Sequence, residues 1–518
     1  MKIFILLQMS VRYGALDTTY IYDDDSDDYE FEEELYQHAR TVEDSQKVHE
    51  KTWWDVALES FLVIYLLITA ANNGMIMGYS AVLLPQLKAV NGSLQIDDEM
   101  GSWMASINSA SIPIGALFSG ILMNYFGRKG ALLIYVGTVI VGWVFILIAE
   151  SHTLVLIGRF FGGIATSLGM VPGQVYIAEI SHSSKRGSYS SISFIGLSFG
   201  ILLIYCLGSV LQWRIVAGLS IIIPVVSALM LLYLPESPVW YVRNGNLDKA
   251  RNACFWFRRN IREALEEVDE LVKRVANENR EREENPRSTL AMFLSPQVLK
   301  PLIIMNVLIM FQSLSGVYLF VFYAVEIISE IGNIEMNHFL VGVITAAVRV
   351  AFTIVATISL AFIGRRPIAI TSALGAGISA MSLGTILYFS PNPNSYLLAG
   401  TLLSYISSST VGLLILPGMM LGEIFPAKVR ALSGSISFSM FSVFTFIITK
   451  MYPILKQTFK FYGMFWFFGT ISFLAAVYVY IALPETKGKT LNDIEDYFLG
   501  NNFLWVTRKT SGTNQEQT

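Results

Sequence analysis

The sequence predicts an all-α integral membrane protein, with twelve transmembrane helices in two six-helix pseudo-repeats and a cytoplasmic helical linker. Three observations predict this fold class. Hydrophobic residues make up 53% of the 518 residues and charged residues only 15%, whereas a soluble chain is nearer about 25% charged. Apolar stretches long enough to cross a bilayer recur twelve times, and three motifs recur once in each half. The high share of hydrophobic residues and the low share of charged ones exclude a soluble globular chain, a disordered chain and a disulfide scaffold.

The chain begins with an acidic segment, residues 1–57. Residues 1–51 hold 13 acidic and 5 basic side chains, although the whole chain has a net charge of only −4. Like charges at this density repel one another, so we expect a disordered cytoplasmic tail. Such a tail either solvates the chain or docks a basic partner.

Each half then holds six stretches of the length that a membrane-spanning helix needs, about 20 mostly apolar residues. In the N-terminal half, residues 58–234, they are 58–79, 102–123, 131–149, 154–178, 190–210 and 215–234. In the C-terminal half, residues 298–483, they are 300–328, 337–363, 368–389, 396–421, 431–449 and 461–483. Hydrocarbon offers no partner to backbone polar groups, so runs of this length are helices.

A charged segment, residues 235–297, separates the two halves, and residues 484–518 form a second cytoplasmic tail. Within the charged segment, apolar side chains recur at helical spacing on one face: Leu265, Val268, Leu271, Val272 and Val275. This pattern predicts an amphipathic helix at the surface of a cytoplasmic linker.

The basic residues of the short loops predict the orientation, because Lys and Arg accumulate on the cytoplasmic side. One side holds eight of them: Arg128, Lys129, Lys185, Arg186, Arg365, Arg366, Lys428 and Arg430. The other side holds four: Lys88, Arg214, Lys456 and Lys460. We therefore expect both termini in the cytoplasm. The sequon at Asn91 falls in the first outer loop, which agrees, and Asn91 is a candidate glycosylation site.

An internal repeat relates the two halves. Residues 125–129 (YFGRK) correspond to 362–366 (FIGRR), 178–180 (AEI) to 422–424 (GEI), and 234–238 (LPESP) to 483–487 (LPETK). Each pair lies at the same helix ends and in the same order. A parallel repeat of six plus six helices is the architecture of transporters that rock two halves about a central site.

The charges in these motifs are candidates for an inner gate, in which ion pairs hold one side shut and break when it opens. The predicted members are Arg128, Arg159, Glu179, Arg186, Glu236, Arg365, Glu423, Arg430 and Glu485. The alternative is that these charges only set the topology. The acidic members argue against it, since the topology rule depends on Lys and Arg.

Together, these motifs resemble the sugar porters of the major facilitator superfamily, and most closely the insect facilitated trehalose transporter group. The matching segments are 127–129, 158–159, 178–187, 235–241, 312–316, 364–366, 422–430 and 484–488. The resemblance covers roughly residues 55–500 and implies a plasma-membrane carrier with a central solute cavity.

The candidate solute-binding residues depart from what the resemblance implies. Gln312 matches the first of two glutamines, but Ser313 stands at the second and Tyr318 at an expected Asn. Phe194 replaces a Gln of the fifth helix, and Gly418 replaces a Trp of the tenth. Residues 77–80 (MGYS) lack the acid of proton-coupled members, which favours a facilitator.

Arg349 stands where the resemblance implies an Asn or Gln in the eighth helix. A charge at that depth is expensive and is a functional candidate by default. It either faces the solute, toward an anionic group, or is a buried Arg satisfied by backbone carbonyls and a partner. Glu326 is the nearest acid in an apolar stretch of the sequence.

Three functions therefore stay open: a passive carrier of a trehalose- or hexose-like sugar, a carrier of a non-sugar and possibly anionic organic solute, and a solute sensor that does not transport. Intact motifs in both halves disfavour the sensor. No metal or nucleophile motif is present, so neither an enzyme nor a cofactor is expected. We expect a monomer in the lipid bilayer that binds a small solute and no nucleic acid.

Overall fold

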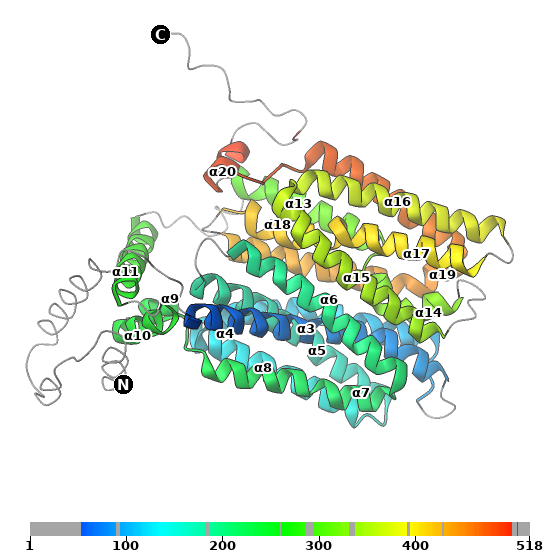
Figure 1. Ribbon diagram of the computed structural model, residues 1–518, viewed down its shortest axis with the longest axis horizontal. Helices are drawn as coiled ribbons and strands as arrows, with labels where there is room; N and C mark the ends of the chain where they lie inside the picture. The colour runs from blue at the N-terminus through cyan, green and yellow to red at the C-terminus, as the bar shows by residue number, and fades with distance from the viewer. Residues whose placement is uncertain are drawn as a thin grey trace, which may run out of the picture. The chain divides into compact units, whose positions relative to one another are not determined.

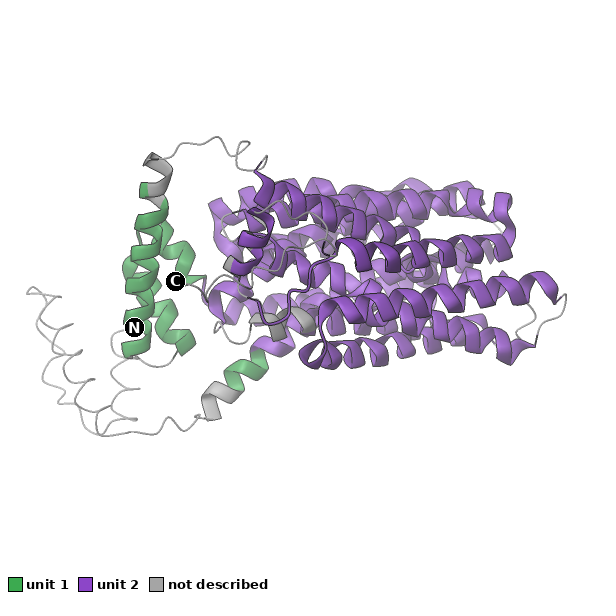
Figure 2. Ribbon diagram, turned by 90° about the horizontal axis from the view of Figure 1, so that it is seen from above, with its two compact units in different colours: residues 1–61, 237–281 green, residues 62–236, 282–518 purple. Residues whose placement is uncertain are grey.

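The computed structural model describes residues 53–89, 94–181, 186–258, 261–284, 295–330, 337–390, 394–426, 429–489, 491–499 and 505. The chain divides into two compact units, residues 1–61 with 237–281 and residues 62–236 with 282–518 (Figure 2). The predicted disordered tail, up to residue 52, and the sequon at Asn91 lie outside the described residues. Apart from residues 58–61, both predicted six-helix halves belong to the second unit.

All regular secondary structure in the described part of the chain is helical, as predicted (Figure 1). In chain order the N-terminal half contains α3 (Trp53–Ala89), α4 (Asp98–Leu147), α5 (His152–Ile180), α6 (Arg186–Val210), α7 (Trp213–Ser220) and α8 (Ile222–Tyr233). The C-terminal half contains α13 (Pro296–Leu314), α14 (Leu319–Glu330), α15 (His338–Phe362), α16 (Arg365–Phe389), α17 (Ser395–Ser409), the π-helix η3 (Thr410–Leu414), α18 (Leu416–Ile424) and α19 (Arg430–Ala482), with α20 (Leu491–Leu499) after it.

Ten helical stretches of the described residues are long and apolar enough to cross a membrane. Two of them, α4 with 50 residues and α19 with 53, are about twice the length that one crossing needs. Each contains one residue with non-helical dihedral angles, Gly127 in α4 and Lys460 in α19. The ten stretches can therefore hold the twelve crossings that the sequence predicts.

Contacts show that α4 runs the length of the bundle and returns. At its start, Asp98 pairs with Lys88 of α3 at 2.6 Å. Beyond its end, Arg214 donates a 2.7 Å hydrogen bond to the carbonyl of Ala149. The preceding residue, Trp213, donates its backbone N–H to Gln86 of α3, two positions before Lys88. Gly127 lies between them, at the opposite end. We call the end with Lys88 the Lys88 end, and the end with the repeated Glu and Arg motifs the signature end.

Small residues let the helices of the bundle approach closely, as in other membrane proteins. A Cβ atom on Gly163 of α5 would overlap the backbone of Asn108 in α4. One on Gly200 of α6 would overlap the backbone of Ala71 in α3. The glycines at these positions therefore allow the helices to pack closely.

Two helices of the C-terminal half are broken in the middle. The first break separates α13 from α14 at Gly316, whose φ of +82° suits glycine and whose Cα faces the ring of Phe468. The second is the π-helix η3, where Ser372 accepts hydrogen bonds of 3.0 Å from the N–H groups of Gly412 and Leu413. Broken helices expose backbone polar groups, and in carriers they line the solute site.

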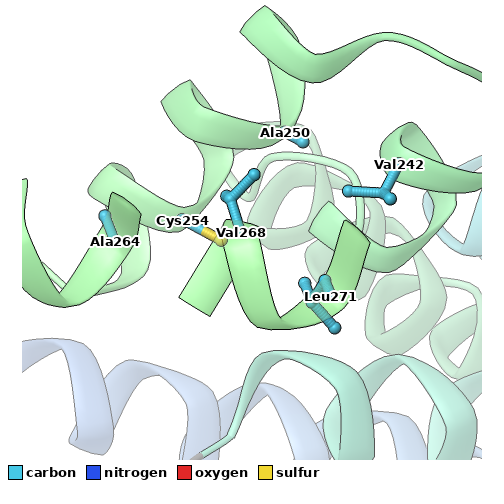
Figure 3. Close-up of a cluster of buried hydrophobic side chains, with 6 residues drawn as sticks. All are labelled: Val242, Ala250, Cys254, Ala264, Val268 and Leu271. Atoms are coloured by element: carbon cyan, nitrogen blue, oxygen red, sulfur yellow. The ribbon is translucent and has the colours of Figure 1, made fainter. Parts of the chain in front are cut away.

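The other unit contains the predicted linker helices: α9 (Pro238–Arg243), α10 (Leu247–Arg258) and α11 (Ile261–Glu284). Their apolar side chains meet in one buried cluster (Figure 3): Val242, Ala250, Cys254, Ala264, Val268 and Leu271. Val272 and Val275 pack against it, so four of the five predicted side chains of the amphipathic face meet this cluster, whereas Leu265 does not belong to it and Ala264 does. An ion pair of 2.7 Å between Arg258 and Glu267 links α10 to α11.

Candidate functional site

At the signature end, the N-terminal half holds a compact network of charged groups. Arg128 donates a 2.7 Å hydrogen bond to the carboxylate of Glu179, which lies near the end of α5. The carboxylate of Glu236 accepts from the backbone N–H of Arg128 at 2.9 Å and from that of Lys129 at 3.0 Å. Glu236 therefore caps the helix segment that starts after Gly127, where free N–H groups need acceptors.

The C-terminal half repeats this network almost atom for atom. Arg365 donates two hydrogen bonds to the carboxylate of Glu423, from Nη2 at 2.8 Å and from Nε at 3.1 Å. The carboxylate of Glu485 accepts from the backbone N–H of Arg365 at 2.9 Å and from that of Arg366 at 3.1 Å. Thr486 adds a 2.6 Å hydrogen bond to Glu423. The sequence repeat is thus a repeat of contacts.

The glycine before each arginine has a steric reason. A Cβ atom on Gly127 would overlap the carboxylate of Glu236, and one on Gly364 would overlap the carboxylate of Glu485. Gly127 has in addition a φ of +79°, whereas Gly364 has an ordinary φ of −64°. The motif therefore requires glycine because the capping carboxylate occupies the space of a side chain.

The structure does not bring all the predicted gate residues together. Both ion pairs, Arg128–Glu179 and Arg365–Glu423, join helices of the same half. The side chain of Arg186 lies outside the described residues. Arg430 donates to the carbonyl of Phe425 within its own half, at 3.3 Å.

Arg159 stands apart from this cluster, because it precedes Glu179 by twenty positions on α5, about 30 Å along a helix. Its guanidinium is 2% exposed and donates to the carbonyls of Met104 and Ile76 and to the hydroxyl of Ser80. Arg159 therefore ties α5 to α3 and α4 nearer the Lys88 end, and the structure does not place it in the predicted inner gate.

The sequence reasoning missed the contacts that join the two halves at the Lys88 end. Lys88 of α3 pairs with Glu326 of α14 at 2.9 Å. Lys450 of α19 donates a 2.8 Å hydrogen bond to Ser102 of α4 and lies 4.1 Å from the ring centre of Trp103. Every residue of α14 from Leu319 to Ile328 is buried. Among the described residues, these contacts close the Lys88 end across the two halves.

In the middle of the bundle, the predicted solute residues are placed as follows. Gln312 is buried and its amide donates a 3.0 Å hydrogen bond to the carbonyl of Leu414, so it satisfies a group that η3 frees. The hydroxyl of Ser313 is buried without a hydrogen-bond partner among the described residues. The ring of Tyr318 packs edge-on against Phe441, with 4.8 Å between centres.

Phe194 and Gly418, from different halves, lie against each other. A Cβ atom on Gly418 would come within 2.7 Å of the Phe194 ring. This contact joins α6 of one half to α18 of the other.

A cavity of about 110 Å³ lies in the N-terminal half, between α3, α5 and α6. Its lining includes Phe194 and the polar side chains of Thr69, Asn73 and Gln174. Such amides and hydroxyls pair with the hydroxyls of a polar solute. No sequence motif marks Asn73 or Gln174, and only the packing of the helices shows that both side chains line one cavity.

Arg349 lies midway along α15 and is 4% exposed. Its Nη1 atom is enclosed and has no hydrogen-bond partner among the described residues. The ionisable groups that act on it are the hydroxyls of Tyr205, Tyr318 and Tyr405. Glu326, the acid considered from the sequence, pairs with Lys88 instead.

This geometry, with two halves carrying the same charge network, two broken helices and one closed end, defines a membrane carrier built from a parallel repeat. Residues 56–498 match the family described as Sugar (and other) transporter, and the chain belongs to that family of transporters. It is a multi-pass membrane protein and not a member of an enzyme family.

Relatives and solved structures agree with this assignment. The chain is 28% identical to the facilitated trehalose transporter Tret1 of Culex quinquefasciatus, over 86% of this chain and 87% of that protein. It is 29% identical to Tret1 of Anopheles gambiae, over 84% of this chain but only 55% of that protein. The solved structure of the proton:xylose symporter XylE bound to 6-bromo-6-deoxy-D-glucose is 23% identical, with a TM-score of 0.69 over 85% of this chain and 99% of that chain. This likeness shows the major facilitator fold.

Proposed function

We propose that this chain carries a sugar or a sugar-sized polar solute through the membrane by facilitated diffusion and alternating access. The observation that carries the proposal is the charge network repeated in each half, together with the contacts that join the halves at the Lys88 end. Lys88–Glu326 and Lys450–Ser102 join the halves there, and Arg128–Glu179 and Arg365–Glu423 each brace one half at the signature end. Two internally braced halves can rock about the centre when such joining contacts break and re-form.

A sugar is the first candidate class of solute, and trehalose is the first neutral sugar to test. The relatives named as trehalose transporters support it, as do the polar residues Thr69, Asn73 and Gln174 on the cavity wall. Each offers donors or acceptors that match sugar hydroxyls. The aromatic faces of Phe194 and Tyr318 suit the apolar face of a sugar ring.

Transport without proton coupling fits the first helix. In α3, the positions near its middle are 77–80 (MGYS), without a carboxylate. The hydroxyl of Tyr79 donates to the carbonyl of Trp213 at 2.8 Å, and Ser80 accepts from Arg159. Both hydroxyls are engaged in hydrogen bonds, and residues 77–80 hold no carboxylate that could carry a proton.

We further propose that the signature end faces the cytoplasm, together with both termini, in the plasma membrane. Eight against four basic loop residues support this orientation. Glycosidase treatment of wild-type protein and of Asn91→Gln tests it, because a glycan on Asn91 requires the Lys88 end to face the lumen or the outside. A glycan that persists in the Asn91→Gln protein would count against the assignment of the site.

Uptake by purified protein in sealed vesicles tests the function. We expect saturable entry of labelled trehalose or glucose that stops when the two sides are equal and that a protonophore does not change. Exchange of internal solute for external label confirms carriage by one site. Accumulation that the protonophore abolishes would mean a symporter. Binding without entry, in protein that is folded, would mean a sensor.

A further inference from the structure

Three arginines of the described residues are buried; Arg128 pairs with Glu179, and the surroundings of the other two differ. Arg159 is 2% exposed and its guanidinium donates to two backbone carbonyls and one hydroxyl. Arg349 is 4% exposed, and its guanidinium makes no hydrogen bond or ion pair with any residue that the structure describes. The first is a structural arginine with its donors satisfied. The second holds a charge that the protein has not paired.

The groups around Arg349 do not supply the missing anion. The hydroxyls of Tyr205, Tyr318 and Tyr405 lie near its charge, and tyrosine is ordinarily a neutral phenol near pH 7. Tyr205 donates its hydroxyl proton to the carbonyl of Val321 at 2.8 Å, and Tyr405 donates to the carbonyl of Ser315. These carbonyls flank the break between α13 and α14. Arg349 therefore faces the broken helix, where a carrier of this architecture holds its solute.

The carboxylates at the two ends of the bundle have other partners, whereas Arg349 lies midway along α15. Glu326 pairs with Lys88 at 2.9 Å, and Glu179 and Glu423 pair with Arg128 and Arg365 at the signature end. A buried cation without a counter-ion is strongly unfavourable in a membrane. An Asn or Gln would offer hydrogen-bond donors to a neutral sugar without that penalty. The charge is thus explained by an anionic group that arrives with the solute.

We propose that Arg349 is the anion subsite of the solute site, and that the preferred solute is a sugar or polyol bearing one carboxylate. This rests on the proposed function, since it names the solute class of the same carrier. A guanidinium and a carboxylate match in charge and in paired hydrogen-bond geometry. A phosphate monoester carries close to two negative charges at neutral pH, and one arginine leaves the second unpaired.

Equilibrium binding to the purified full-length protein tests the subsite without requiring transport. The matched probes are D-glucose and D-glucuronate, which share a ring and differ at one carbon, with glucose 6-phosphate as the dianion. We expect tighter binding of glucuronate than of the other two. Arg349→Gln should weaken glucuronate binding by at least about 30-fold, the range seen when one partner of a buried charge pair is removed. Arg349→Lys should retain part of it.

The ratio of glucuronate to glucose binding is the readout, because it does not depend on how much protein folds. Arg159→Gln is the control, and its folded fraction should keep the wild-type ratio. A ratio that Arg349→Gln leaves unchanged overturns the proposal. The proposal is also overturned if the wild-type protein prefers glucose or trehalose and Arg349→Gln loses that preference, because Arg349 would then be a hydrogen-bond donor to neutral sugars.

Uptake in the same vesicles separates this inference from the proposed function. Entry of glucuronate should accelerate when the vesicle interior is made positive, because each transported solute carries one negative charge, whereas glucose entry should not respond. Binding of glucuronate with no uptake of any solute would support the subsite and overturn the carrier function. Uptake of glucose alone, insensitive to voltage and to Arg349→Gln, would support the carrier and overturn the subsite.

Discussion

Replacing Glu326 by Gln should release the closed Lys88 end. The change removes the 2.9 Å ion pair that joins α3 of one half to α14 of the other. Lys88 keeps its 2.6 Å pair with Asp98, so no cation is left alone, and the penalty of about 3–5 kcal/mol for orphaning a buried charge does not apply.

The size of the effect follows from the burial of the pair. The side chain of Lys88 is 28% exposed and that of Glu326 only 8%. Exposed pairs contribute up to about 1 kcal/mol, so this partly buried pair should contribute about 2 kcal/mol, between the exposed and the fully buried case. The ratio of closed to open Lys88 ends should therefore fall roughly 30-fold.

Distances between spin labels measure this shift. Labels on cysteines placed at Gln95 and Asn337, one in each half and both exposed, report the opening of the Lys88 end. Glu330→Gln is the matched control, since Glu330 lies on the same helix but pairs with Lys456 of its own half at 2.6 Å. An unchanged distance distribution in Glu326→Gln, or an equal shift in Glu330→Gln, would refute the role of the cross-half pair.

Three further predictions follow from close contacts. Gly418→Ala should slow transport about tenfold, because its Cβ would lie 2.7 Å from the Phe194 ring. Adding Phe194→Ala to this variant should restore the rate, and a double variant whose loss of rate is the sum of the two single losses would contradict the prediction. Gly127→Ala should lower the melting temperature more than Gly364→Ala, since both overlap a carboxylate but only Gly127 has a positive φ; equal shifts would argue otherwise. Burial raises the pKa of the Cys254 thiol to about 12, so at pH 8 maleimide should label it only after unfolding, as mass spectrometry can measure.

The predicted charge motifs illustrate how far sequence patterns reach. Arg128 with Glu179 and Arg365 with Glu423 could be grouped because the motif repeats at equivalent helix ends. Arg159 is predicted with them, yet the structure places it toward the other end of α5, twenty positions before Glu179. Position along a helix is readable from sequence only when the direction of that helix is taken into account.

The partners of the predicted solute residues were beyond the sequence. Gln312 is predicted to bind the solute, but its amide donates a hydrogen bond to the carbonyl of Leu414. That carbonyl is available as an acceptor because it lies in the π-helix. The contact of Phe194 with Gly418 joins residues more than two hundred positions apart. Neither contact has a local signal, because each depends on how two helices are broken and packed.

The sequence alone determined the helices of this protein, its repeated signature and its family, because hydropathy and motif spacing are local properties that lipid and helix geometry translate directly into structure. The tertiary structure decided which charges have partners. It satisfied Arg159, joined Lys88 to Glu326 and left Arg349 without a partner among the described residues. Pairing of charges depends on distances between helices that are remote in the chain, and packing sets those distances.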